Sequence, residues 1–252
     1  MKGEFAAARG PALRLVSFDI DGTLTRVHGW QHIAEGLGRR LDYERTQGAF
    51  LRGERGEDEH LRALLALGEG ERRSRVEGLL ATTPRLTGIR PAVRSLHRAG
   101  LRVVLLTHNP TWVGRWYAHR FGFDAWTGVV QPVVRGRLGS APRFHLDKRI
   151  TMGRMLRNFG IRPIEAAHVG DAGPDARVFP YLGTGVALNT NRRSVLRAAD
   201  LFVCSQDLRD LLPFLSRAFK ARVPPWPSER GPASDLQVEE KESYVRGQTV
   251  PT

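Results

Sequence analysis

The first regular pattern in the chain is a run of apolar and β-branched residues at 13–20, LRLVSFDI. Its length is typical of a strand that is buried on both faces of a parallel sheet. From 27 to 91 the pattern changes to leucines and alanines at helical spacing among many charges, which predicts a small helical bundle. We interpret this second segment as a cap inserted into an α/β core.

Beyond residue 91, strand-like and helix-like patterns alternate. The predicted strands cover 101–107, 165–171, 183–189 and 199–205, a hairpin covers 129–140, and the predicted helices cover 92–100, 111–122, 147–160 and 207–219. This alternation predicts an α/β fold with a doubly wound parallel sheet. In that architecture ligands bind beyond the carboxyl ends of the strands. The expected core therefore comprises 13–26 and 92–221.

The two ends of the chain lack such patterns. We interpret 1–12 as a short flexible arm, and 222–252 as a flexible tail because it combines turn-forming residues and charges without periodicity. No apolar run is long enough to cross a bilayer, and the first residues lack the uninterrupted apolar core of a signal peptide. We therefore expect a cytoplasmic protein without a membrane partner.

Composition adds two expectations. The formal charge of +13 comes mainly from arginines scattered through every segment, which favours solvated side chains over a dedicated nucleic-acid surface, although nucleic-acid binding stays open. Hydrophobic residues make up 41% and charged residues 26%, as in an ordinary globular protein. Cys204 is the single cysteine, so no intramolecular disulfide can form, and its apolar surroundings predict a buried strand position.

Acidic residues follow two of the predicted strands. Asp19 and Asp21 are two positions apart and are expected to point to the same side as the first strand ends. Asp171 ends a second strand, and Asp175 follows four residues later. Carboxylates gathered at one sheet edge repel one another unless a cation is present, and Mg²⁺ prefers such oxygen ligands. The sequence therefore predicts a magnesium site at this edge.

Two further positions suit a phosphate group. Thr107 ends another strand just before a helix start, where a hydroxyl and free backbone N–H groups can bind an anionic oxygen. Lys148 lies at the start of a predicted helix in a chain dominated by arginine, and its compact ammonium suits both a phosphate and an attacking carboxylate.

Four motifs have now been described, namely the pair Asp19 and Asp21, then Thr107, then Lys148, and then the pair Asp171 and Asp175. In this order and at these separations they resemble the signature of the haloacid dehalogenase superfamily over roughly residues 13–218. The chain looks most like the branch that contains phosphoserine phosphatase, because a helical cap directly follows the first motif and a hairpin follows the second. The resemblance implies a Rossmann-like core with an inserted cap, and hydrolysis of a small-molecule phosphate ester by way of an aspartyl phosphate.

The resemblance also implies a role for each acidic residue. Asp19 is the expected nucleophile, Asp21 the acid that protonates the leaving oxygen and then the base that activates water, and Lys148 a third catalytic residue. Mg²⁺ would be held by Asp19, by Asp21 through its backbone carbonyl, and by Asp171. Asp175 would orient these magnesium ligands.

Substrate contacts are expected on both sides of the cleft. By the same resemblance, the groups that bind substrate or phosphate are Thr107, His108, Asn109 and Gly22. Thr107 and Asn109 also fit helix-capping positions. His28 and Trp30 lie where the cap begins, near the mouth of the predicted cleft, although a tryptophan there also fits a core anchor.

The chain departs from the pattern of this branch at three places. The stretch 25–30 contains no acid where phosphoserine phosphatases carry a glutamate that recognises the substrate amino group, Pro174 replaces an asparagine, and His108 replaces a glycine. The substrate therefore stays open. Two other functions also stay open, namely a phosphotransferase or phosphomutase that uses the same aspartyl phosphate, and a non-enzymatic protein that binds nucleic acid.

Overall fold

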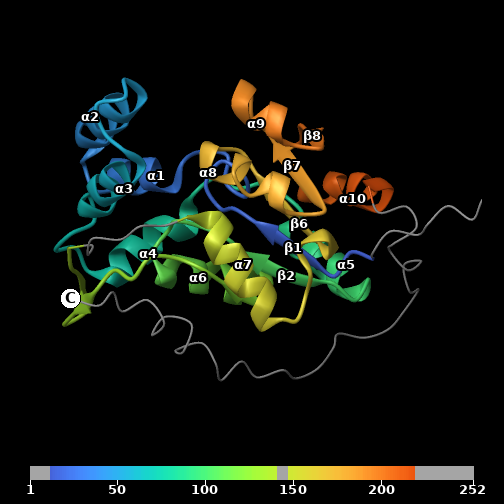
Figure 1. The fold of residues 1–252 in the computed structure, drawn as a ribbon. Helices are drawn as coiled ribbons and strands as arrows, with labels where there is room; N and C mark the ends of the chain where they lie inside the picture. The colour runs from blue at the N-terminus through green and yellow to red at the C-terminus, as the bar shows by residue number, and fades with distance from the viewer. Residues whose placement is uncertain (1–11, 141–146, 219–252) are drawn as a thin grey trace, which may run out of the picture.

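The computed structural model describes residues 12–140 and 147–218 (Figure 1). The strands in chain order are β1 (Leu15–Phe18), β2 (Arg102–Leu105), β3 (Ala125–Trp126), β4 (Val133–Val134), β5 (Arg137–Leu138), β6 (Ala166–Gly170), β7 (Thr184–Leu188) and β8 (Leu201–Val203). The α-helices are α1 (Gly29–Gly36), α2 (Arg40–Leu51), α3 (Glu57–Ala66), α4 (Arg73–Thr82), α5 (Ile89–Arg98), α6 (Thr111–Phe121), α7 (Lys148–Asn158), α8 (Gly173–Ala176), α9 (Arg193–Ala198) and α10 (Leu212–Ala218). Three short 3₁₀ turns are η1 (Pro163–Glu165), η2 (Phe179–Tyr181) and η3 (Leu208–Leu211).

Six strands form one parallel sheet in the order β3-β2-β1-β6-β7-β8. The sequence order of the strands reverses beside β1. In doubly wound sheets such a reversal creates the crevice in which ligands bind. In the register, Phe18 pairs with Leu105 on one side and with Val169 on the other. The residues that follow these three strands therefore lie side by side at one edge of the sheet.

Helices cover both faces of this sheet. Side chains alternate along each strand, so Val16 and Phe18 pack into the core shared with α5, α6 and α10, whereas Leu15 packs into a second core shared with α7. Phe179 and Val195 form a third, smaller cluster over β7. The all-buried pattern of β1, β6 and β7 explains why their sequences are almost continuously apolar.

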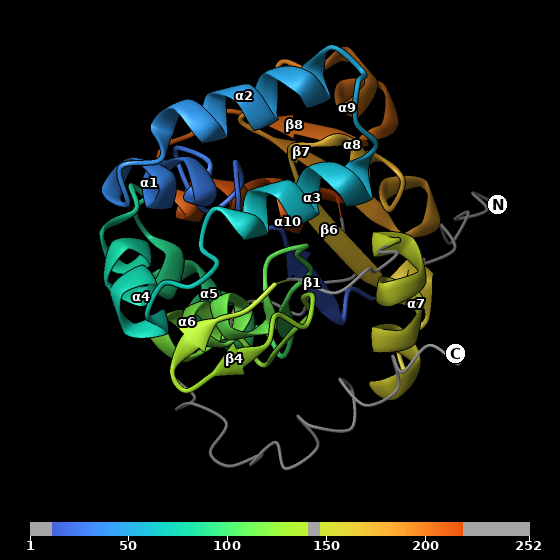
Figure 2. The same cartoon turned by 90° about the vertical axis from the view of Figure 1, so that its left-hand side faces the viewer.

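Helices α1 to α4 form the helical segment predicted between the first two sheet strands. Figure 1 places α1, α2 and α3 together beyond one end of the sheet, and Figure 2 shows α2 and α3 from that side. Trp30, Leu65 and Val76 from this segment belong to the same apolar cluster as the α5 and α6 side of the core. The hairpin β4–β5 also contacts this segment, because Leu138 N–H donates to Glu71 O at 2.9 Å. The division into core and cap stays a prediction.

The predicted α/β architecture with its parallel sheet is confirmed, and so is the hairpin. Three elements were missed, β3, α8 and α9, because two, four and six residues are too few for a periodic pattern. The fifth helix begins at Ile89 rather than after Pro91, since a proline in the first turn removes no helical hydrogen bond. The prediction for Cys204 was wrong: β8 ends at Val203, and Cys204 is exposed just beyond it.

Within the described residues, no helix combines the length and the apolar character that a membrane crossing requires. The predicted arm, apart from Ala12, and the predicted tail lie outside the described residues.

Candidate active site

Asp19 is buried where β1 ends, in the middle of the crevice. Its side chain is 11% exposed, and its backbone N–H donates to Val169 O of the neighbouring strand at 3.0 Å. Burial raises the pKa of Asp19 well above its ordinary value, and the nearby Asp175 and Asp171 add to this, whereas Lys148 opposes it. A carboxylate in this place needs a positive partner to stay ionised.

Lys148 supplies one such partner. It is the first residue of α7, which Asp147 caps by accepting hydrogen bonds from the N–H groups of Arg149 and Ile150. The Lys148 Nζ lies 3.0 Å from Asp19 Oδ1 and 2.6 Å from Asp175 Oδ1. Burial opposes its charge, but the two carboxylates outweigh burial and raise the pKa of Lys148. The structure therefore brings Lys148 into contact with two of the acidic residues.

Asp175 is fully buried and uses both of its oxygens within the protein. Oδ1 accepts from Lys148 Nζ and from His168 Nε2 at 2.9 Å, while Oδ2 accepts from the backbone N–H groups of Asp171 at 3.1 Å and Ala172 at 3.0 Å. Burial alone would raise the pKa of Asp175, but Lys148 and His168 outweigh it and hold the pKa far below the ordinary value. Asp175 thus fixes both the lysine and the turn that carries Asp171.

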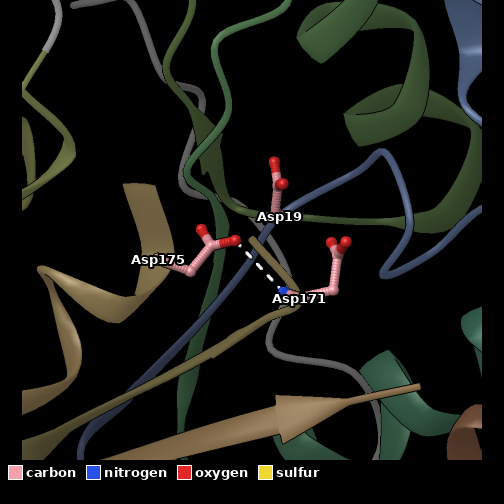
Figure 3. Close-up of side chains that lie close together, drawn as sticks. All are labelled: Asp19, Asp171 and Asp175. Atoms are coloured by element: carbon pink, nitrogen blue, oxygen red, sulfur yellow. Dashed lines mark hydrogen bonds between the residues drawn. The ribbon is translucent and has the colours of Figure 1, made fainter. Parts of the chain in front are cut away.

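Asp171 completes an acidic cluster with Asp19 and Asp175. One oxygen of each lies within 4.8 Å of the others, and Figure 3 shows the three side chains close together, with Asp19 and Asp171 just beyond β1 and β6 and Asp175 on α8. Thr23 Oγ1 donates to Asp171 Oδ1 at 3.0 Å. Burial and, to a smaller extent, the charge of Asp175 together raise the pKa of Asp171 to about 7.

This cluster fits a divalent cation. Asp19 and Asp171 both have raised pKa values because burial and mutual repulsion oppose their charges, and a cation between them would relieve both effects. The donors are all carboxylate oxygens, which Mg²⁺ prefers. The oxygens of Asp175 already accept four hydrogen bonds, so Asp19 and Asp171 are the carboxylates with room for an ion.

The side chain of Asp21 contacts the start of the helical segment. Its Oδ1 accepts from the backbone N–H of Gly29 at 2.7 Å, and its Oδ2 accepts from Asn109 Nδ2 at 2.8 Å. Gly29 is the first residue of α1. Asp21 therefore lies between the first turn of α1 and the loop after β2.

The loop after β2 supplies a hydroxyl close to Asp21. Thr107 Oγ1 accepts from Asn109 N–H at 3.1 Å and from Asn109 Nδ2 at 3.0 Å. Its own proton has no hydrogen-bond acceptor among the residues that the structure describes, so it can be donated to a bound oxygen. His108 lies between these two residues, and burial lowers its pKa to about 3, so its imidazole is neutral.

The predicted site residues thus come together from four segments of the chain. The sequence analysis missed two residues that bind to them, His168 and Thr23. His168, at 0% exposure, bridges Asp175 and Ser17 Oγ, and Thr23 binds Asp171. Their positions near the two acidic motifs were the available signal, but a buried histidine in a strand has many other uses. His28 accepts from Trp30 N–H and so begins α1.

Gly22 is required by a close approach of two chain segments. Its φ is +78°, and a Cβ added there would lie 2.4 Å from Asp171 Oδ2. Gly38 has nearly the same φ, +76°, but open space around it. We expect Gly38→Ala to lower the free energy of unfolding by about 1–2 kcal/mol through backbone strain alone, and Gly22→Ala to lower it clearly more. Urea unfolding measures both, and equal losses would contradict the close approach.

Comparison with known proteins assigns this arrangement to a family. A doubly wound sheet with paired carboxylates at its carboxyl edge defines an α/β class of enzymes with an acidic centre. The family model of haloacid dehalogenase-like hydrolases matches residues 13–183. The chain belongs to this family, and its relatives place it in the phosphoserine phosphatase-like branch.

Relatives at modest identity support that branch. A phosphoserine phosphatase of Wolinella succinogenes is 29% identical over 215 residues, which cover 81% of this chain and 100% of that protein. One of Streptomyces coelicolor is 28% identical over 192 residues, which cover 75% of this chain but only 46% of that protein. A solved structure of a phospho-aspartyl intermediate analogue of phosphoserine phosphatase has a TM-score of 0.71 at 19% identity, covering 81% of this chain and 99% of that one. This last likeness concerns the fold.

Proposed function

We propose that the protein is a Mg²⁺-dependent phosphatase that hydrolyses a small-molecule phosphomonoester through an aspartyl phosphate on Asp19. The observation that carries the proposal is the placement of Asp19. It is a buried carboxylate 3.0 Å from the ammonium of Lys148, in a cluster with Asp171 at the strand ends. A nucleophile, a positive charge and a cation site within one crevice suit the transfer of a phosphoryl group.

In the first step, an Asp19 oxygen attacks phosphorus as the bond to the substrate oxygen breaks. The electron pair of that bond leaves with the alcohol, and Asp21 supplies the proton that makes the alcohol neutral. Lys148 and the Thr107 hydroxyl donate to phosphoryl oxygens and offset their charge. Asp19 and Asp171 would hold Mg²⁺, which when bound supplies positive charge against the phosphoryl group.

In the second step, Asp21 takes a proton from water, whose oxygen attacks phosphorus. The bond between phosphorus and the Asp19 oxygen breaks, and its electron pair returns to the carboxylate. Inorganic phosphate leaves and Asp21 is again protonated for the next substrate. The position of Asp21, between the Gly29 N–H and Asn109, suits it to both proton transfers.

Phosphate release from a panel of phosphomonoesters tests this function. The panel contains phosphoserine, sugar phosphates, nucleotides and an aryl phosphate, each with and without Mg²⁺. Asp42→Asn is the matched control, because Asp42 is an exposed carboxylate on α2. We expect Mg²⁺-dependent release by wild type and Asp42→Asn and none by Asp19→Asn. Equal release by all three proteins, or transfer to an added alcohol in place of hydrolysis, would contradict the proposal.

The pKa of Asp171 gives a pH dependence for Mg²⁺ binding. With a pKa of about 7, Asp171 is protonated in the ion-free protein below that pH, so Mg²⁺ has to displace a proton there. The increase in Tm on adding Mg²⁺ should therefore be larger at pH 8 than at pH 6. Thermal unfolding at both pH values measures this increase. Asp171→Asn should remove most of it, and an increase that is independent of pH would contradict this assignment.

A further inference from the structure

Asn109 occupies a position between the loop after β2, the carboxylate of Asp21 and the first turn of α1. It is 6% exposed. Its Nδ2 donates to Asp21 Oδ2 at 2.8 Å and to Thr107 Oγ1 at 3.0 Å, and its Oδ1 accepts from Trp30 Nε1 at 3.1 Å. One buried amide therefore links the core motif to the start of the helical segment.

The chemistry of the indole fixes which way this amide points. An indole N–H can only donate, so the Asn109 atom that faces Trp30 must be the oxygen. The amide nitrogen then faces Asp21, whose carboxylate can only accept when ionised. If the Trp30 N–H were lost, the amide could turn, and an amide oxygen facing the Asp21 carboxylate would repel it.

Other uses of this side chain account less well for these contacts. Helix α6 begins after Pro110 and has no side-chain cap, so Asn109 does not cap it. Both polar ends of the amide are engaged by protein groups, which leaves no free donor for a phosphate oxygen. The contacts instead converge on the carboxylate to which the proposed function assigns both proton transfers.

We propose that Asn109 is a positioning residue for Asp21 and that Trp30 sets the orientation of its amide. The start of α1 then acts on Asp21 twice, through the Gly29 N–H at one oxygen and through Trp30 and Asn109 at the other. Proton transfer to the leaving group thus depends on how the first turn of α1 is positioned relative to Asp21 and Asn109. This role rests on the proposed function.

The first test compares two esters whose leaving groups need a proton to different degrees. An alkyl phosphate has a poor leaving group that depends on protonation, whereas 4-nitrophenyl phosphate has a good one. The value of kcat/KM covers the step in which the leaving group departs. For Asn109→Ala and Trp30→Phe we expect it to fall about 10- to 100-fold with the alkyl ester and far less with the nitrophenyl ester. The fall should not exceed the lower end of the range of about 10²- to 10⁴-fold that acid–base catalysis contributes, because Asp21 itself stays in place.

Trp112→Phe is the matched control. Trp112 is a buried indole whose Nε1 donates to Gln131 Oε1 at 3.3 Å, away from the acidic residues. This variant loses the same kind of hydrogen bond, and both esters should respond to it alike. An equal fall for both esters in Asn109→Ala and Trp30→Phe would overturn the proposal, because a purely structural role does not distinguish leaving groups.

The second test does not depend on activity. The protein has five tryptophans, and the indole N–H signal that is absent in Trp30→Phe identifies Trp30 in an NMR spectrum. We expect Asp21→Ala to shift this signal and to speed its hydrogen exchange, since the amide of Asn109 loses its acceptor. An unchanged signal would overturn the proposal. If wild type hydrolyses neither ester, the proposed function fails and the role of Asn109 in proton transfer fails with it, while a shifted Trp30 signal would still establish the link from Asp21 through Asn109 to Trp30.

Discussion

Replacing Lys148 by methionine is expected to lower phosphate release by about a thousandfold and to destabilise the fold by about 3–5 kcal/mol. Methionine keeps the length of the side chain but removes the charge. Lys148 lies between Asp19 and Asp175, and its side chain is only 4% exposed. Without it two buried carboxylates lose their common partner, and the attacking oxygen and the transferred phosphoryl group lose an ammonium.

The measurement for Lys148→Met is phosphate release at saturating Mg²⁺ together with urea unfolding. Arg154→Met is the control, because Arg154 is an exposed cation on the same helix. It should change neither quantity appreciably. A Lys148→Met protein that keeps the wild-type rate would contradict the role of Lys148, even if its stability falls.

Asp175→Asn and Asp171→Asn are expected to differ in their effect on stability, because only the first should destabilise the fold. Asp175 accepts four hydrogen bonds, and an amide in its place would turn a donor towards one of these donors, so we expect a loss of about 3–5 kcal/mol. Burial opposes the charge of Asp171, so at pH 8 without Mg²⁺ its neutralisation should leave the free energy of unfolding unchanged or raise it.

The pH dependence separates these two aspartates further. Because the folded-state pKa of Asp175 is depressed, its stabilisation is present above the ordinary pKa of about 4 and is lost as the pH falls below it. Asp171 has a raised pKa, so its contribution is present below about pH 4 and is lost as the pH rises towards 7. Urea unfolding from about pH 2 to pH 8 covers both pH ranges and measures both contributions. Equal and parallel losses for the two variants would contradict the different environments of the two carboxylates.

The sequence predicted five of the six sheet strands, their parallel arrangement and the residues at the carboxyl edge of the sheet. Apolar runs that end in Asp19, Thr107 and Asp171 are local patterns, and parallel order brings their ends together. The helical character of residues 27–91 was equally visible. The sequence did not show that the apolar side chains of this segment pack into the same core as α5 and α6, because periodicity does not say which partner a helix packs against.

The side-chain bonds within the site were beyond sequence reasoning. Asn109 was expected to bind substrate, but its amide is engaged by residues 79 and 88 positions away along the chain. His168 was passed over because its neighbours predict only a buried strand, and its bond to Asp175 depends on a turn seven residues later. Such bonds depend on rotamers and on distant segments, which a motif does not encode.

The most direct test of the nucleophile is to trap the phosphorylated protein. Wild type and Asp19→Asn are mixed with Mg²⁺ and the best ester of the panel, quenched in acid within one turnover, and digested for mass spectrometry. A phosphoryl group on the peptide that contains Asp19 in wild type, and on no peptide in the variant, is the predicted result. Phosphate release by Asp19→Asn at the wild-type rate, or a phosphoryl group on another residue, would contradict the role of Asp19.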